Sequence, residues 1–140
     1  PISALVGKDS LKESAENVYF TGTQFLNSAP MAAAKATIDE LVKQDAVTKM
    51  NNFGNLLKES LVKIAEDFDV KMIVSGVPAM PYFRIEDEDK TLHSRWVDAC
   101  LSKGLYLTDY HNHFISVAHE EEHLKKFEDI ARAAFEVVKL

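Results

Sequence analysis

The sequence of 140 residues predicts an α/β or α+β fold, and three patterns support that class. Apolar residues recur every three or four positions through residues 47–68, as they do on one face of an amphipathic helix. After residue 69 the pattern changes to short apolar runs bounded by glycine and proline, which indicates strands. A second helical stripe follows at 124–138. The chain after residue 69 is therefore predicted to form a layer of strands covered by two helices.

Shorter elements are predicted ahead of the long helix. Residues 2–6 are apolar and are expected to form a strand, and residues 9–15 are expected to form one or two helical turns. A polar loop then leads into a further helix, which Asn27 or Ser28 can cap. Pro30 suits the first turn of that helix, where a backbone N–H is not needed.

The long helix carries a glycine on its apolar stripe. Glycine costs about 1 kcal/mol of helix propensity relative to alanine, so Gly54 needs a structural reason. A close approach by another backbone segment and a kink are both consistent with the pattern. The stripe consists of Val47, Met50, Gly54, Leu57, Leu61, Ile64 and Phe68.

Four strands are predicted after the long helix, at 70–75, 79–86, 105–107 and 114–118. Pro81 lies inside the second run and has no N–H, so that strand is expected at an edge or a bulge. A solvated acidic turn precedes a helix that ends at Gly104. Glutamates open the last helix, where the helix dipole favours them. The turn covers 86–90, and these glutamates are Glu120, Glu121 and Glu122.

The composition argues against nucleic acid and membrane partners. The net charge is -6 and the chain has three arginines, so it offers no basic surface to a phosphate backbone. No apolar run approaches the ~20 residues of a membrane-spanning helix. Cys100 is the only cysteine, so no internal disulfide forms and the cytoplasm is the expected compartment.

Two histidine motifs point to chemistry, and each has a structural alternative. The stretch "HEEEH", His119–His123, fits the zinc pattern H-E-x-x-H, but its first histidine directly follows an apolar run instead of lying in a helix. We therefore expect no metal and interpret the motif as an acidic first turn, with a zinc hydrolase as a minor alternative. The stretch "HNH", 111–113, is expected either to face a substrate or to be a polar loop between strands.

Two single residues are also candidates. Arg84 follows an apolar residue on a predicted strand, and it can either bind a substrate carboxylate or pair with nearby acids. Cys100 lies at an apolar position of a predicted helix, which favours a buried structural thiol over a nucleophile.

Several stretches, in this order and spacing, resemble the class III (fold type I) aminotransferases that depend on pyridoxal 5′-phosphate (PLP), in the branch of glutamate-1-semialdehyde aminomutase. The family loop G-T-x-x-x-N-P-x-x-x-A-A corresponds to residues 22–33. Its later turn, substrate loop, apolar strand and helix start correspond to "GLYLT", "DYHNH", "FISVA" and "AHEEEHL". The resemblance implies the C-terminal part of such a transferase. Residues 1–68 would end the large domain and supply connecting helices, and 69–140 would form a small α/β C-terminal domain.

The resemblance also implies site residues. Gly22 and Thr23 would bind the PLP phosphate of the partner subunit, so that the phosphate site is shared across a homodimer. Several departures from the family pattern leave the substrate open. They are Leu26 in place of a glycine, Ser28 in place of a proline, His111 in place of an acid and Glu120 in place of a threonine. The residues that would line the substrate pocket are His111, Asn112 and His113.

The lysine that holds the cofactor would lie upstream of Pro1, so the chain is expected to have no catalytic residue of its own. The parent would transfer an amino group between an amino acid and a carbonyl compound, such as a semialdehyde or a sugar. Two alternatives stay open: a 2,1-aminomutase of the glutamate-1-semialdehyde type, and a non-catalytic binding or dimerisation module.

Overall fold

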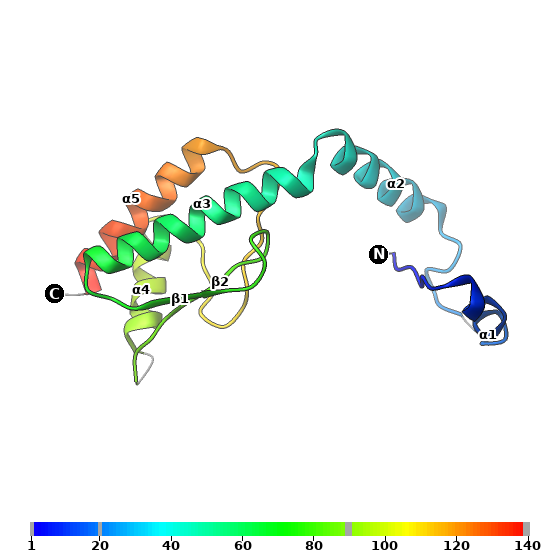
Figure 1. Cartoon of the computed structure of the whole chain (residues 1–140), viewed down its shortest axis with the longest axis horizontal. Helices are drawn as coiled ribbons and strands as arrows, with labels where there is room; N and C mark the ends of the chain where they lie inside the picture. The colour runs from blue at the N-terminus through cyan, green and yellow to red at the C-terminus, as the bar shows by residue number, and fades with distance from the viewer. Residues whose placement is uncertain (1, 20, 89–90, 139–140) are drawn as a thin grey trace. The chain divides into compact units, whose positions relative to one another are not determined.

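The computed structural model describes residues 2–19, 21–88 and 91–138. Contacts divide the chain into two compact units, Pro1–Lys43 and Gln44–Leu140, whose α-helices and strands are labelled in Figure 1. The first unit contains η1 (Asp9–Leu11), α1 (Lys12–Glu16) and α2 (Ser28–Lys43). The second contains α3 (Ala46–Asp67), β1 (Met72–Ser75), β2 (Tyr82–Ile85), α4 (Thr91–Ser102) and α5 (Glu121–Val138).

The first unit confirms the predicted helices and corrects one strand. The turns expected at 9–15 are present as η1 and α1. The side-chain oxygen of Asn27 accepts the N–H of Ala29 at 3.2 Å, so Asn27 caps α2 as predicted. The prediction of a strand at 2–6 is wrong, because a strand needs a neighbour for its ladder and no described segment pairs with these residues.

Helix α3 confirms the long amphipathic helix and explains its glycine. Most of the predicted stripe faces the core, while Val47 at its start is 65% exposed and is an exception. A Cβ at Gly54 would lie 1.9 Å from the carbonyl oxygen of Pro78, in the turn between β1 and β2. Close backbone approach is therefore the reason for the glycine.

Strands β1 and β2 form an antiparallel hairpin, so two of the four predicted strands are confirmed in shorter form. The side chains of Phe83 and Ile85 are 2% and 1% exposed and face the core. Pro81 is buried and immediately precedes β2. Strand β2 is paired with β1 alone in the described sheet, which agrees with the edge position predicted for a strand that contains a residue without an N–H.

The other two predicted strands, 105–107 and 114–118, are wrong as regular strands. The second of these segments still lies beside the chain that leads into β2. The N–H of His113 donates to the carbonyl of Pro81 at 2.7 Å, and the N–H of Ile115 donates to that of Ala79 at 2.9 Å. Pro81 has no N–H with which to return the bond from His113, so this rung of a ladder is incomplete.

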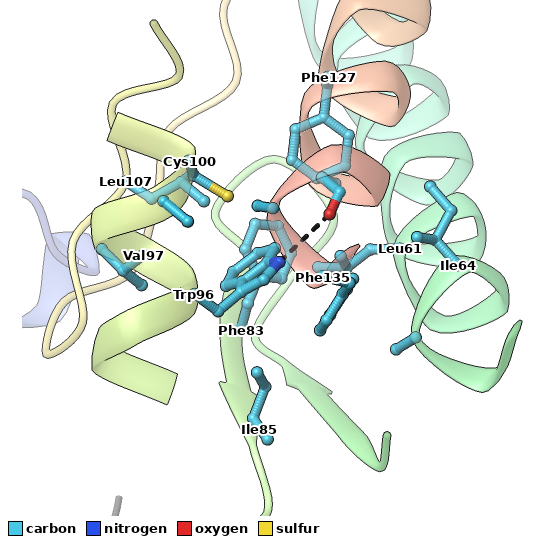
Figure 2. Packing of buried hydrophobic residues seen from close by; sticks show 14 of the residues in the cluster. Leu61, Ile64, Phe83, Ile85, Trp96, Val97, Cys100, Leu107, Phe127 and Phe135 are labelled. Carbon is cyan, nitrogen blue, oxygen red and sulfur yellow. Dashed lines mark hydrogen bonds between the residues drawn. The ribbon is translucent and has the colours of Figure 1, made fainter. Parts of the chain in front are cut away.

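Helix α5 packs against α3 and α4, and α4 also packs against β2, around one apolar core that Figure 2 shows. Trp96 is fully buried, its indole N–H donates to the carbonyl of Ala131 at 3.4 Å, and its ring stacks on Phe135 at 5.2 Å between centroids. Gly104 ends α4 with a φ of 90°, as the sequence predicted. None of the helices in the described ranges is both long and apolar enough to cross a membrane.

Two further sequence predictions concern the start of α4 and the boundary between domains. Asp87, in the turn predicted to be merely solvated, accepts the N–H of Leu92 at 2.8 Å and so supports the start of α4. Residues 89–90 of that turn lie outside the described residues. The contacts group α3 with the second unit, whereas the sequence places the domain boundary after residue 68. The division into a large and a small domain stays a prediction.

Candidate functional site

The second unit contains a partly open cleft of about 460 Å³. Loop 105–115 forms most of its wall, and α3, β2 and α5 contribute one side chain each. Leu57, Phe83 and Phe127, which come from these three elements, are nearly inaccessible to solvent and form its floor. A volume of this size is typical of small-molecule sites.

The side chain of His113 connects the wall of the cleft to the chain ahead of β2 through hydrogen bonds and ring stacking. Its Nδ1 lies 3.4 Å from the carbonyl oxygen of Pro81, and its Nε2 accepts the N–H of Thr108 at 3.2 Å. The ring stacks on Phe83 with 4.9 Å between centroids. These bonds require a neutral ring with its proton on Nδ1. Burial lowers the pKa of His113, which favours the same neutral form.

The other two residues of the "HNH" stretch also line the cleft, and of these His111 is exposed and Asn112 is half-buried. Nδ1 of His111 lies 2.9 Å from the carbonyl oxygen of Asn112, and the hydroxyl of Thr108 donates to the carbonyl of His111 at 3.1 Å. The structure thus brings His111, Asn112 and His113 together in one cleft.

Arg84 does not line this cleft. Its neighbours Phe83 and Ile85 face the core, so Arg84 lies on the opposite face of the hairpin, in register with Ile73. Within the described residues Arg84 forms no ion pair, so the predicted pairing with acids is not observed there. Its role toward a carboxylate stays a prediction.

Gly22 and Thr23 lie in the turn that leads into α2, in the first unit. The carbonyl of Gly22 accepts the N–H of Phe25 at 3.0 Å, which shapes the turn. A Cβ on Gly22 would meet nothing within 4 Å, so this side of the turn is open. Leu26 has a φ of 60°, in the left-handed region that favours glycine, and the family pattern has glycine there.

The turn fits a phosphate group through neutral donors. Thr23 is exposed and offers a hydroxyl and a backbone N–H shortly before a helix N-terminus. The stretch 21–31 contains no lysine or arginine, so it would supply hydrogen bonds and no positive side chain.

The "HEEEH" motif lies across the start of α5, as the sequence predicted. Nδ1 of His119 accepts the N–H of Ser116 at 3.0 Å, and Nδ1 of His123 accepts the N–H of Glu120 at 3.0 Å. Among residues 2–19, 21–88 and 91–138, no group of three potential metal ligands is present.

The sequence reasoning missed the aromatic rim of the cleft. Tyr106, Tyr110 and Phe114 line it and are 75%, 81% and 62% exposed. Their spacing of four residues along a loop was the signal that could have drawn attention to them. It also missed His93, which is buried, accepts the N–H of Ile85 at 3.4 Å, and has its pKa lowered by burial.

Comparison with known proteins gives both aminotransferases and aminomutases as relatives. The aminopentol aminotransferase of Sphingopyxis macrogoltabida is 29% identical over 99% of this chain, which covers 33% of that protein. The glutamate-1-semialdehyde 2,1-aminomutase of Methanothrix thermoacetophila is 30% identical over 90% of the chain and 33% of that protein. The chain thus spans about a third of the length of these curated relatives. No family model matches it.

Solved structures similar to this chain also belong to the transaminases. The FumI protein of Sphingopyxis sp. MTA144, in its PLP internal aldimine form, matches with a TM-score of 0.90 and 25% identity, over 95% of this chain and 32% of that one. An omega-transaminase from Sphaerobacter thermophilus matches with a TM-score of 0.76 and 16% identity, over 88% of this chain and 31% of that one. The fold is therefore that of a part of a fold type I transaminase. The chain is homologous to PLP-dependent aminotransferases and glutamate-1-semialdehyde aminomutases, and the predicted resemblance is confirmed.

Proposed function

We propose that the protein to which these 140 residues belong is a PLP-dependent aminotransferase, which moves an amino group from an amine or amino acid to a carbonyl compound. The observation that carries the proposal is the match to FumI over 95% of the chain with a TM-score of 0.90. Bound PLP supplies an electron sink for bond breaking at the carbon that carries the amino group.

The proposed phosphate contact is the turn at Gly22 and Thr23. The exposed hydroxyl and backbone N–H of Thr23 would donate to phosphate oxygens, and the open side of Gly22 would let the group approach the backbone. Following the family resemblance, the phosphate would belong to the cofactor of a second subunit, so that each subunit of a homodimer completes the site of the other.

The lysine that holds the cofactor is proposed to lie outside these residues. The chain spans about a third of the length of its relatives, and none of its lysines stands where the family pattern has that group. The chain's own contribution would then be phosphate binding at Thr23 and contact with the substrate in the cleft beside His111. The cytoplasm stays the predicted compartment.

A titration of the dimeric protein with PLP tests the phosphate site. A hydrogen bond to a charged group contributes about 1.5–3 kcal/mol, so Thr23→Val should weaken PLP binding by roughly one to two orders of magnitude. Because a ligand shared between subunits stabilises their association, the variant should also dissociate at a higher protein concentration. Ser14→Ala, which removes an exposed hydroxyl of α1, is the control. Equal PLP affinity in Thr23→Val and the wild type would remove Thr23 from the site.

A requirement for a second substrate separates the two enzyme classes among the relatives. An aminotransferase takes the amino group from one molecule and needs a carbonyl acceptor to turn over again. An aminomutase moves the group within one molecule and needs no acceptor. Turnover of a single amine that stops without an added acceptor supports the proposal. Continued isomerisation of glutamate-1-semialdehyde without an acceptor favours the aminomutase, and no PLP binding at all favours a non-catalytic module.

A further inference from the structure

We propose that the cleft under loop 105–115 binds the uncharged, apolar part of the amine substrate, and that it selects against substrates carrying a carboxylate at that end. The inference rests on the proposed amino transfer and names the substrate class of that site. Three observations support the inference: the cleft itself, its buried apolar floor, and the hydrogen bonds that its polar groups already form within the protein.

The floor of the cleft is apolar and buried. Leu57, Phe83 and Phe127 are each between 2% and 7% exposed, and Ile115 from the loop is 9% exposed. A hydrocarbon chain lying on this floor leaves water for an apolar surface, which is favourable in proportion to the area buried. A charged end placed there would lose its hydration without gaining a partner.

Most polar groups of the wall already form hydrogen bonds within the protein. Both ring nitrogens of His113 face backbone groups, and the hydroxyl of Thr108 donates to a carbonyl of the same loop. Nδ1 of His119 accepts the N–H of Ser116. The hydroxyls of Tyr106 and Tyr110 remain at the rim, where the described residues give them no hydrogen bond. A ligand is therefore offered apolar contact below and hydrogen-bonding groups without a permanent charge above.

No permanently charged side chain lines the described part of the cleft. The described residues that line the cleft include no lysine, arginine, aspartate or glutamate, and Arg84 lies on the other face of the hairpin. Carboxylates in proteins are bound by arginine or lysine, or by several N–H donors. The cleft accordingly suits an alkyl or hydroxyalkyl amine better than an amino acid that ends in a second carboxylate.

Binding of probes without an amino group tests the cleft independently of amino transfer. Calorimetry on the PLP-loaded protein would compare 1-butanol, 1-hexanol and hexanoate. Each methylene that the cleft buries should tighten binding about fourfold, so 1-hexanol, which has two more methylenes, should bind roughly 15-fold more tightly than 1-butanol. It should also bind at least tenfold more tightly than hexanoate, because the carboxylate would be desolvated without a partner. Equal affinity for 1-hexanol and hexanoate would overturn the proposal.

Two variants of Phe114, at the rim of the cleft, test whether the binding preference arises in this cleft. Phe114→Ser should reduce the preference for 1-hexanol over 1-butanol at least threefold, and Phe114→Arg should shift the preference toward hexanoate. Leu101→Ser removes an apolar side chain of α4 that is 50% exposed and does not line the cleft, and it should change neither ratio. The same ratios in the Phe114 and Leu101 variants would place the binding elsewhere and overturn the proposal.

Turnover with amines then separates this inference from the function it rests on. Hexylamine should be used with a kcat/KM at least tenfold above that for 6-aminohexanoate, and Phe114→Arg should narrow the difference. Selective alcohol binding with no amino transfer from any amine would overturn the aminotransferase proposal and, with it, the assignment of the ligand as a substrate. Transfer with equal use of both amines would overturn only the cleft assignment.

Discussion

Substituting Gly54 by alanine should destabilise the second unit even though alanine is the better helix former. The new Cβ would lie 1.9 Å from the carbonyl oxygen of Pro78 and 2.5 Å from its carbonyl carbon. Ordinary contact begins at 3.4 Å, so the helix and the hairpin turn must separate by about 1.5 Å. Both sides of this contact are backbone, so no side-chain rotation can relieve it.

The size of the effect follows from two opposing contributions. Alanine in place of glycine stabilises a helix by about 1 kcal/mol. Overpacking of a well-packed contact costs about 1–3 kcal/mol, and a clash between backbone atoms lies toward the upper end of that range. The free energy of unfolding should therefore fall by about 2 kcal/mol.

Urea unfolding of the purified protein, followed by circular dichroism and tryptophan fluorescence, measures this change. Asn55→Ala is the matched control, because Asn55 is the exposed neighbour of Gly54 on the same helix and its replacement should stabilise slightly. An unchanged or higher free energy of unfolding in Gly54→Ala would refute the close approach of α3 to the turn at Pro78.

Three further expectations concern the second unit. His111→Ala should change kcat/KM for amine substrates while leaving the absorbance of bound PLP intact, and identical kinetics across donors would remove His111 from the substrate site. Burial raises the pKa of the Cys100 thiol to about 12, so a thiol reagent at pH 8 should label it only after unfolding; rapid labelling of the native protein would contradict its burial. Burial also lowers the pKa values of His93 and His113 from the ordinary 6.5, so the unfolded chain binds more protons below that pH. The free energy of unfolding should then fall as the pH drops through 6.5. In urea titrations, His113→Gln should make the free energy of unfolding less dependent on pH. The same pH dependence in this variant and the wild type would mean that His113 titrates normally.

The helices could be predicted from the sequence because their signals are local. The stripe that contains Leu57, Leu61 and Ile64 repeats every three or four residues, and that spacing alone places these side chains on one face. Asn27 precedes a helix and caps it through a bond to a residue two positions away. Each of these interactions joins residues that are neighbours in the chain.

The strands were less predictable because a strand exists only through a partner. Residues 2–6 and 105–107 are as apolar as true strands, yet within the described residues no segment offers them a ladder. The segment at 114–118 does lie beside the chain ahead of β2, where Pro81 lacks the N–H that would return one bond of a ladder. Apolar runs therefore predicted hydrogen-bonded sheet only in part.

The sequence by itself determined the amphipathic helices, the family resemblance and the residues of the "HNH" stretch as candidates, because these depend on residue type and short spacing. Tertiary structure alone decided that Gly54 meets Pro78, that His113 is bound through both ring nitrogens, and that Arg84 lies away from the cleft. These facts join segments that are distant in the chain, so they depend on how α3, the hairpin and loop 105–115 pack. The apolar character of the cleft has the same origin, since its floor collects single side chains from three separate elements.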